Sequence, residues 1–304
     1  MGFSVGIRCA LTVAAGAFGV MSTTGAVGAP SASSGRSLIL YRYPASAQTG
    51  RIELWTTNGA GSEARRLTVV TPPPDRGFLG ARLTHSGDVI YAVSDAVHGN
   101  VDDLYLVDHR TGRSRLMFGV RGLVTFAASP DGLRIAYGLS LPVAGKPATF
   151  VADLDGSHRR RIVPVAASYA LEWPVPDMLF MVGGEGSCWF CAVSVATGAQ
   201  HPVPIPVANS QGNPAVSPRA DRVAFCDLKG PAGERIYTTS GKFLRNLVGT
   251  CGDAFWSPDE KRLLIQSPGL SVFGFATHRL STFHHAGPQG SMDVLDWQAT
   301  DGQN

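Results

Sequence analysis

Four cysteines in the body of this 304-residue chain are the side chains best suited to chemistry. Cys188 and Cys191 form a Cys-x-x-Cys motif, and Cys226 and Cys251 follow it singly. Such a motif can be half of a zinc site, a redox couple or a disulfide. The sequence has no second Cys-x-x-Cys to complete a zinc site, and no predicted helix start that would lower a thiol pKa. We therefore expect the four cysteines to form disulfides rather than a metal site.

The remaining reactive side chains are scattered. The only adjacent histidines, His284 and His285, would point to opposite faces of a strand and could not easily share a metal. Residues 153–156, Asp-Leu-Asp-Gly, are similar to the opening of a calcium loop, but the basic segment 157–161 supplies no further acidic ligands. Signatures of serine hydrolases, phosphate loops and zinc proteases are missing from the sequence. We therefore expect no catalytic residue, no cofactor and no metal.

A repeat sets the elements that must position these residues. Its clearest copies are 128–137, 216–225 and 256–265, in which Ser-Pro and turn residues separate two apolar runs. Pro presets one turn angle and Asp or Gly tolerates the next, so each copy predicts a β-hairpin. A second hairpin follows in most units, with Asp155-Gly156 or Thr197-Gly198 at its turn. Four short strands recurring every 40–51 residues are typical of a propeller blade.

The two ends of the repeat predict how the ring closes. The first unit starts directly with a second-strand sequence, 38–41, whereas 293–298 has the sequence of a first strand with nothing after it. The fold class is therefore all-β, a six-bladed β-propeller of four-stranded antiparallel blades. We expect it to span residues 38–298, with a tail at 299–304, and to close by pairing the C-terminal strand with the N-terminal blade. The second strands of the six units are anchored at Leu38, Val89, Arg134, Met178, Arg222 and Arg262.

The Ser-Pro-Asp-Gly hairpins, followed by Asp-x-Asp-Gly or Thr-Gly hairpins, resemble the TolB-type propeller repeats, which are also described as WD-like. The resemblance covers residues 38–298. TolB carries a separate α/β domain ahead of its propeller, so the resemblance is to the propeller alone. It implies protein interaction in the periplasm.

The N-terminal residues 1–29 have the pattern of a secretory signal peptide, followed by a disordered spacer at 30–37. The apolar run 9–21 is too short to span a bilayer comfortably. Cys9 lies at the start of that run, whereas a lipid-attachment cysteine follows it, which argues against a lipoprotein. We expect a monomer that is secreted or held in the cell envelope, with no membrane span after cleavage. The formal net charge of +3 argues against nucleic acid as a partner.

The repeat also narrows the cysteine pairing. Cys226 falls at the end of the second strand of the fifth unit, and Cys251 lies just before the first strand of the sixth. These two places share one face of a propeller, so a Cys226–Cys251 disulfide would join neighbouring blades. Cys188 and Cys191 flank the middle turn of the fourth unit and would pair locally.

The Ser, Pro and Asp residues that recur in every unit are explained by turn chemistry, so we look for function where the repeat fails. The fourth unit departs most, and the loops at 71–76 and 95–103 are also distinctive. By their position in the repeat, these segments emerge on one face, around the mouth of the channel. The ligand-face candidates there are Trp189, Glu185, His98 and Asp102.

The sequence favours a non-enzymatic module that binds an unknown protein or small ligand at the cell envelope or outside the cell. The alternative is a propeller lyase or hydrolase, acting on carbohydrates or lactones at the channel mouth. Such enzymes gather several ionisable groups on the axis. The expected first strands carry only a few such groups, and these are Glu172, Asp253, Asp293 and Asp296.

Overall fold

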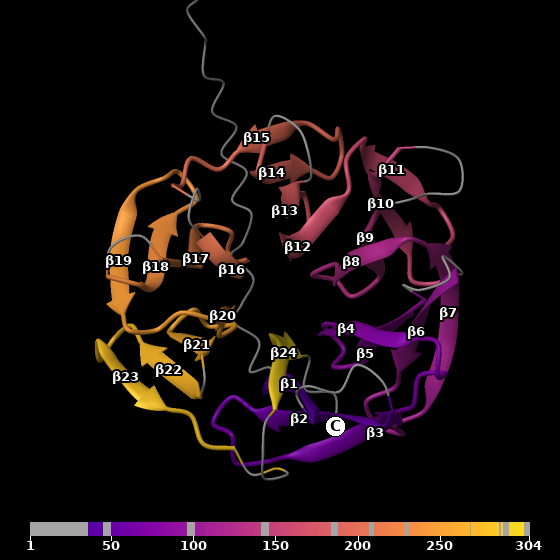
Figure 1. Cartoon of the computed structure of the whole chain (residues 1–304), viewed down its shortest axis with the longest axis horizontal. Coiled ribbons are helices and arrows are strands. Elements are labelled where there is room, and N and C mark those ends of the chain that lie inside the picture. The colour runs from indigo at the N-terminus through magenta and orange to yellow at the C-terminus, as the bar shows by residue number, and fades with distance from the viewer. Residues whose placement is uncertain are drawn as a thin grey trace, which may run out of the picture. The chain divides into compact units, whose positions relative to one another are not determined.

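The computed structural model describes residues 36–44, 50–95, 101–140, 146–183, 188–206, 210–228, 231–267, 269–285, 287 and 292–300. All regular structure in these ranges is β, and the 24 strands form six four-stranded antiparallel sheets. The sheets are arranged as blades around a central axis, in chain order (Figure 1). Within the described ranges, no helix is long and apolar enough to cross a membrane.

From the innermost strand outward, blade 1 consists of β24 (Asp293–Thr300), β1 (Arg36–Tyr43), β2 (Ile52–Asn58) and β3 (Arg65–Val70), and blade 2 of β4 (Gly77–Leu83), β5 (Val89–Ser94), β6 (Val101–Val107) and β7 (Ser114–Arg121). In the same order, blade 3 consists of β8 (Leu123–Ala128), β9 (Arg134–Leu139), β10 (Ala148–Asp153) and β11 (Arg160–Val163), and blade 4 of β12 (Ala167–Val175), β13 (Met178–Gly183), β14 (Phe190–Ser194) and β15 (Gln200–Pro202). Blade 5 consists of β16 (Ser210–Val216), β17 (Arg222–Asp227), β18 (Gly233–Thr238) and β19 (Phe243–Val248), and blade 6 of β20 (Asp253–Trp256), β21 (Arg262–Gln266), β22 (Leu270–Gly274) and β23 (Arg279–Thr282).

The ring closes through the two ends of the propeller, as predicted. β24 pairs with β1 in an antiparallel register that places Trp297 opposite Ile39. The indole N–H of Trp297 also donates to Ser37 Oγ at 2.6 Å. Both strands are longer than expected, because β1 begins at Arg36 and β24 continues to Thr300. Closure leaves neither of these strands with an unpaired edge at the joint.

The recurring turn residues are part of the scaffold. In blade 6, Ser257 Oγ donates to Asp259 at 2.7 Å and accepts the backbone N–H of Arg262 at 2.8 Å. In blade 3, Ser129 Oγ makes the same two contacts with Asp131 and Arg134. These bonds satisfy the polar groups of a tight turn, which explains why the motif recurs without a catalytic role.

The core is divided among the junctions between blades. Six clusters of buried apolar residues are found in the described ranges, and each combines side chains from two neighbouring blades. Three junctions add a cation–π contact, in which an arginine at the start of a second strand covers a tryptophan of the next blade. These pairs are Arg134 with Trp173, Arg222 with Trp256 and Arg262 with Trp297, at 4.7–5.0 Å.

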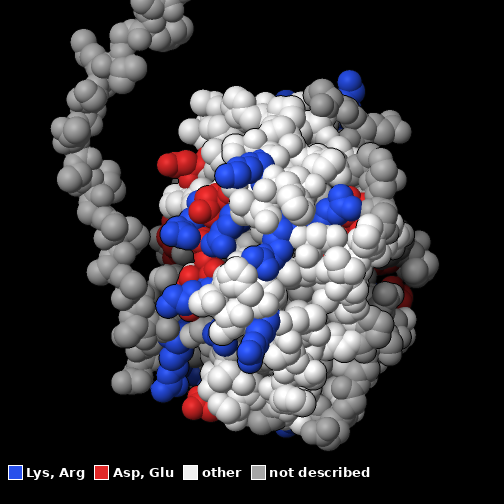
Figure 2. All heavy atoms as spheres, turned by 90° about the vertical axis from the view of Figure 1, so that its left-hand side faces the viewer, with Lys and Arg blue, Asp and Glu red and all other residues white. Residues whose placement is uncertain are grey.

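The propeller has two faces, which we name by their connections. On the turn face, short turns join the first strand of a blade to the second and the third strand to the fourth. On the connection face, loops join the second strand to the third, and each blade to the next. Figure 2 shows that charged side chains on the wall of blades 5 and 6 gather towards one side, while much of the remaining wall is uncharged. The turns of these two blades carry Arg219, Lys242 and Lys261.

Candidate functional site: the central channel

The first strands of the blades line a central channel with two connected halves. Each half has a volume of about 270 Å³. The half towards the turn face is walled by Trp173, Trp256, Trp297 and several prolines, with Asp296 among them. The half towards the connection face contains Asp253 and Asp293. A channel of this size with a few converging polar groups is a typical place for a ligand.

Arg82 and Glu172 line both halves and therefore lie where the halves meet. Arg82 comes from β4, and its Nη1 donates to the carbonyl oxygens of Ala81 and Leu295 at 3.0 Å. These two bonds tie the guanidinium to the channel wall between blades 1 and 2. The structure places one positive side chain at the centre of a channel that is otherwise acidic.

Among the four channel carboxylates, Glu172 has the fewest contacts. It comes from β12, and no hydrogen bond or ion pair holds it in the described part of the chain. Burial raises the pKa of Glu172 to about 7, while Arg82 opposes the rise and Asp296 adds to it. An acid in this state exchanges a proton near neutral pH, so a small change in its surroundings changes its charge.

Asp296 is buried but well bonded. Its carboxylate accepts the backbone N–H groups of Leu83 and Trp297, each at 2.8 Å. Burial raises the pKa of Asp296, although Arg82 and these hydrogen bonds oppose the rise. The bond to Leu83 fastens blade 1 to blade 2, so Asp296 has a structural role in addition to its place in the channel.

Asp253 and Asp293 begin the first strands of blades 6 and 1 at the connection face. Burial raises the pKa of Asp253, and the charge of Asp293 adds to that rise. Asp293 is compensated, because Arg42 Nε donates to it at 2.9 Å and the amide of Gln266 also donates to it. This end of the channel therefore carries one compensated carboxylate and one that is not ion-paired.

The sequence correctly predicted that Glu172, Asp253, Asp293 and Asp296 face the channel. It missed Arg82. The available signal was its position in the first strand of blade 2, one residue before the end of β4.

The ligand-face candidates are not gathered at one point. Trp189 lies just before β14 in blade 4 and is 42% exposed, whereas Asp102 lies in blade 2 and is 2% exposed. The carboxylate of Asp102 accepts bonds from Ser94 Oγ and from the backbone N–H groups of Asp95 and Leu123, which joins blade 2 to blade 3. Glu185 and His98 lie outside the described residues. The ligand-face role of these four residues stays a prediction.

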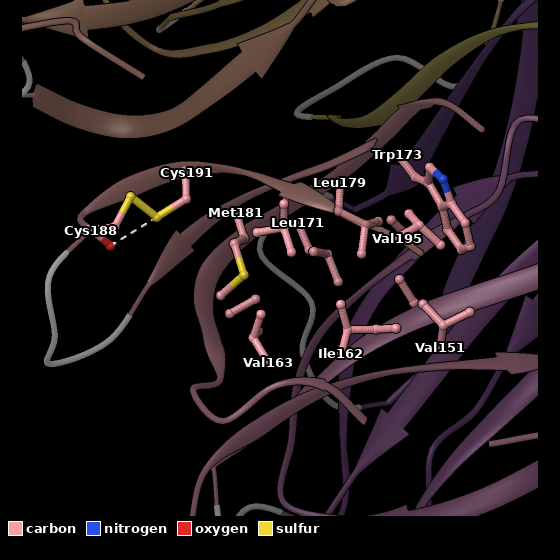
Figure 3. Packing of buried hydrophobic residues seen from close by; sticks show 14 residues of the cluster. Val151, Ile162, Val163, Leu171, Trp173, Leu179, Met181, Cys188, Cys191 and Val195 are labelled. Carbon is pink, nitrogen blue, oxygen red and sulfur yellow. Dashed lines mark hydrogen bonds between the residues drawn. A yellow bond between two sulfur atoms is a disulfide. The ribbon is translucent and has the colours of Figure 1, made fainter. Parts of the chain in front are cut away.

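Both predicted disulfides are present. Cys226–Cys251 joins β17 of blade 5 to the connection leading into blade 6, and Cys188–Cys191 spans three residues within blade 4. Figure 3 shows Cys188 and Cys191 at one end of the apolar cluster between blades 3 and 4, beyond Met181. Both bridges lie on the connection face.

The histidines are placed differently from expectation. His284 and His285 follow β23 instead of lying on an outer strand. In the described ranges, no group of three or more His, Cys, Asp or Glu side chains is arranged to hold a metal ion.

Comparisons with known proteins agree with the geometry. No family model matches the chain, and none of the curated proteins matches it. Among solved structures, TolB from Acinetobacter baumannii is 16% identical, with a TM-score of 0.67 over 87% of this chain and 66% of that chain. A chain of a nidogen/laminin complex is 14% identical, with a TM-score of 0.58 over 87% of this chain and 99% of that one.

An oligogalacturonate lyase in complex with manganese is 12% identical, with a TM-score of 0.55 over 84% of this chain and 82% of that one. At these identities the likeness establishes the fold, which is a six-bladed propeller like that of TolB. It leaves the activity of this chain open, since propellers serve both binding and catalysis.

Proposed function

We propose that this protein is an exported, non-enzymatic binding module whose ligand enters the central channel. The observation that carries the proposal is the junction of the two channel halves, where no side chain of the described residues bonds to Glu172 and where Arg82 also lines the channel. Unused hydrogen-bonding capacity inside a cavity is what a ligand-binding site requires.

Export is supported by the cysteines and by the N-terminal pattern. All four cysteines of the propeller are in disulfides, which persist in oxidising compartments. The signal-peptide pattern of residues 1–29 agrees with this location. The similar structures also include a nidogen/laminin complex, in which a propeller takes part in a protein–protein assembly.

A second candidate is catalysis in the same channel. Its support is the pKa of Glu172, which burial raises to about 7, because a carboxyl group in that range can act as a general acid or base at neutral pH. The oligogalacturonate lyase shows that a similar fold can be an enzyme. In this candidate, Glu172 would exchange the proton and Arg82 would stabilise developing negative charge.

The two candidates are separated by one experiment. A panel of short peptides, small amines and neutral oligosaccharides is titrated into the full propeller by calorimetry, and each mixture is then examined by mass spectrometry. Binding of an unchanged compound, weakened in Glu172→Gln and Arg82→Leu variants, supports the binding module. Conversion of a compound that stops in Glu172→Gln supports the enzyme. Binding that survives both substitutions would remove the channel from consideration.

A further inference from the structure

We infer that the channel binds an alkyl ammonium or guanidinium group, such as the side-chain end of a lysine or arginine in an extended peptide, with the Glu172 carboxylate as its acceptor. The inference rests on the proposed function, because it names the ligand class of the same site. It is carried by the charge, the contacts and the walls of the channel.

The charge balance selects a cation. Four carboxylates line the two halves, against one arginine and His85. Asp293 has Arg42 as its partner, but Glu172 and Asp253 have no ion pair in the described structure. The repulsion between carboxylates that line one channel is relieved by a positive group, whereas an anion would add to it.

Glu172 identifies where the positive group binds. Its carboxylate has acceptor capacity that no donor in the described ranges uses, and it borders both halves of the channel. An ammonium or guanidinium group has several N–H donors and no acceptor, which is the complement of a free carboxylate. The neighbouring Asp296 contributes less, because its oxygens already accept two backbone N–H groups.

The walls suit the rest of such a side chain. The half towards the turn face is lined by three tryptophans, Phe255 and prolines, with Glu172 at its inner end. The methylene stem of a lysine or arginine packs well along apolar surface while its charged end reaches a polar partner. The ligand therefore enters from the turn face with its charged end leading.

Binding of this kind releases a proton. A cation beside Glu172 favours the ionised acid, so the pKa of Glu172 falls from about 7 when the ligand is bound. The groups facing Glu172 are Arg82 from β4 and Asp296 from β24, with Asp253 and Asp293 further along the same channel. Because binding favours the ionised form of Glu172, affinity rises with pH as this group ionises, between about 6 and 8, and then levels off.

Three peptides of one length test the ligand class: acetyl-Gly-Gly-Lys-Gly-Gly-amide and its norleucine and glutamate counterparts. Calorimetry at pH 8 should give saturable binding of the lysine peptide, at least about tenfold tighter than the norleucine peptide. Glu172→Gln should lose at least about tenfold in affinity for the lysine peptide. The control Glu63→Gln removes an exposed carboxylate outside the channel and should bind as the wild type does.

The proton released on binding is measured by repeating the titration with the lysine peptide in buffers of different ionisation enthalpy. The wild type should release a fraction of a proton near pH 7, and Glu172→Gln should release none. Thermal melting of each variant confirms that it is folded, and Asp253→Asn serves as a second variant with weaker loss. Butylamine tests whether the cation belongs to a peptide or to a free amine. If butylamine binds as tightly as the lysine peptide, the ligand is a free amine.

Equal binding of the three peptides, or tighter binding of the glutamate peptide, overturns the ligand class but leaves the binding module in place. Absence of binding by the lysine peptide and by butylamine also overturns it. The wider panel described under the proposed function then decides separately whether the channel binds anything.

Discussion

The carboxylates in the tight turns of the turn face and four carboxylates of the channel and connection face have pKa values that shift in opposite directions. On the turn face, the pKa values of Asp108, Asp155 and Asp221 are lowered. In the channel and on the connection face, the pKa values of Glu172, Glu234, Asp253 and Asp296 are all raised. The difference lies in the balance between burial and hydrogen-bond donors rather than in residue type, since the pKa of Asp296 is raised by burial although two backbone N–H groups donate to it.

Two residues, Asp131 and Glu234, explain the contrast. At Asp131, burial alone would raise the pKa, but bonds from Ser129 and the backbone N–H of Leu133 outweigh it. At Glu234, which is 0% exposed, neither carboxyl oxygen makes a hydrogen bond of good geometry. A carboxylate that accepts enough hydrogen bonds, such as Asp131, stabilises a turn. A buried carboxyl group that lacks them, such as Glu234, either stays protonated or needs a donor from a bound ligand.

The largest expected effect comes from a bonded carboxylate of the turn face. Glu260 is buried, with its side chain 3% exposed, and it is ion-paired with Arg219 and Arg222. Arg222 in turn covers Trp256 at the junction of blades 5 and 6. Glu260→Ala should lower the free energy of unfolding by about 3–5 kcal/mol, because it removes the buried ion-pair partner of Arg222 and leaves that guanidinium only its 3.4 Å contact with the exposed Asp221.

Urea denaturation measures this loss, with Glu63→Ala as the control for removing an exposed carboxylate. A loss at Glu260 no larger than at Glu63 would contradict the view that bonded carboxylates hold the turn face together.

Removing a disulfide of the connection face should give the next largest loss in the free energy of unfolding. The two disulfides close loops of different length, so their losses can be compared. Cys226–Cys251 closes a separation of 25 residues, and Cys188–Cys191 a separation of 3. The chain-entropy model predicts a loss of about 3–4 kcal/mol for the Cys226→Ala/Cys251→Ala pair and about half as much for the local pair. Equal losses in urea denaturation would show that strain or packing, rather than loop closure, sets the contribution.

The overall architecture was predictable because it depends on local patterns that repeat. Five of the six anchors, from Val89 to Arg262, coincide with the first residues of their strands. Turn chemistry also separated scaffold aspartates such as Asp131 from the channel carboxylates. These properties follow from neighbours within a few residues, which a sequence displays directly.

Properties that depend on contacts between blades were not predictable. Glu234 lies between Gly233 and Arg235 in an ordinary strand sequence, and its burial arises from its partners in space. Arg82 reaches its role through the carbonyl of Leu295, more than two hundred positions away. The same limit applies to Asp102, proposed as a ligand-face residue but bonded to the backbone of blade 3.

Glu234 gives the third prediction. Burial raises its pKa to about 8, with the backbone N–H of Gly252 opposing the rise and Asp253 adding to it. Because the folded pKa lies above the unfolded one, its contribution to stability is complete below the unfolded pKa and is lost as pH rises towards 8. The stability of the wild type should fall by up to about 1.4 kcal/mol per pH unit in this range from this group.

Glu234→Gln should flatten this part of the stability profile, as measured by urea denaturation from about pH 5 to 8. An unchanged slope would show that Glu234 is ionised in the folded protein, and that the contrast between the two faces is weaker than the structure indicates.

The smallest effect distinguishes a raised pKa that serves a ligand from one that is only buried. Burial raises the pKa of Glu172 less, to about 7, so its contribution to stability is lost over a narrower pH range, and Glu172→Gln should stabilise the protein at pH 8 by less than Glu234→Gln does. The two substitutions should differ in binding. Glu172→Gln should weaken binding of the lysine peptide, whereas Glu234→Gln should leave it unchanged, because Glu234 is outside both channel halves. A residue whose removal raises stability while lowering affinity is kept for function, because stability alone would not retain it.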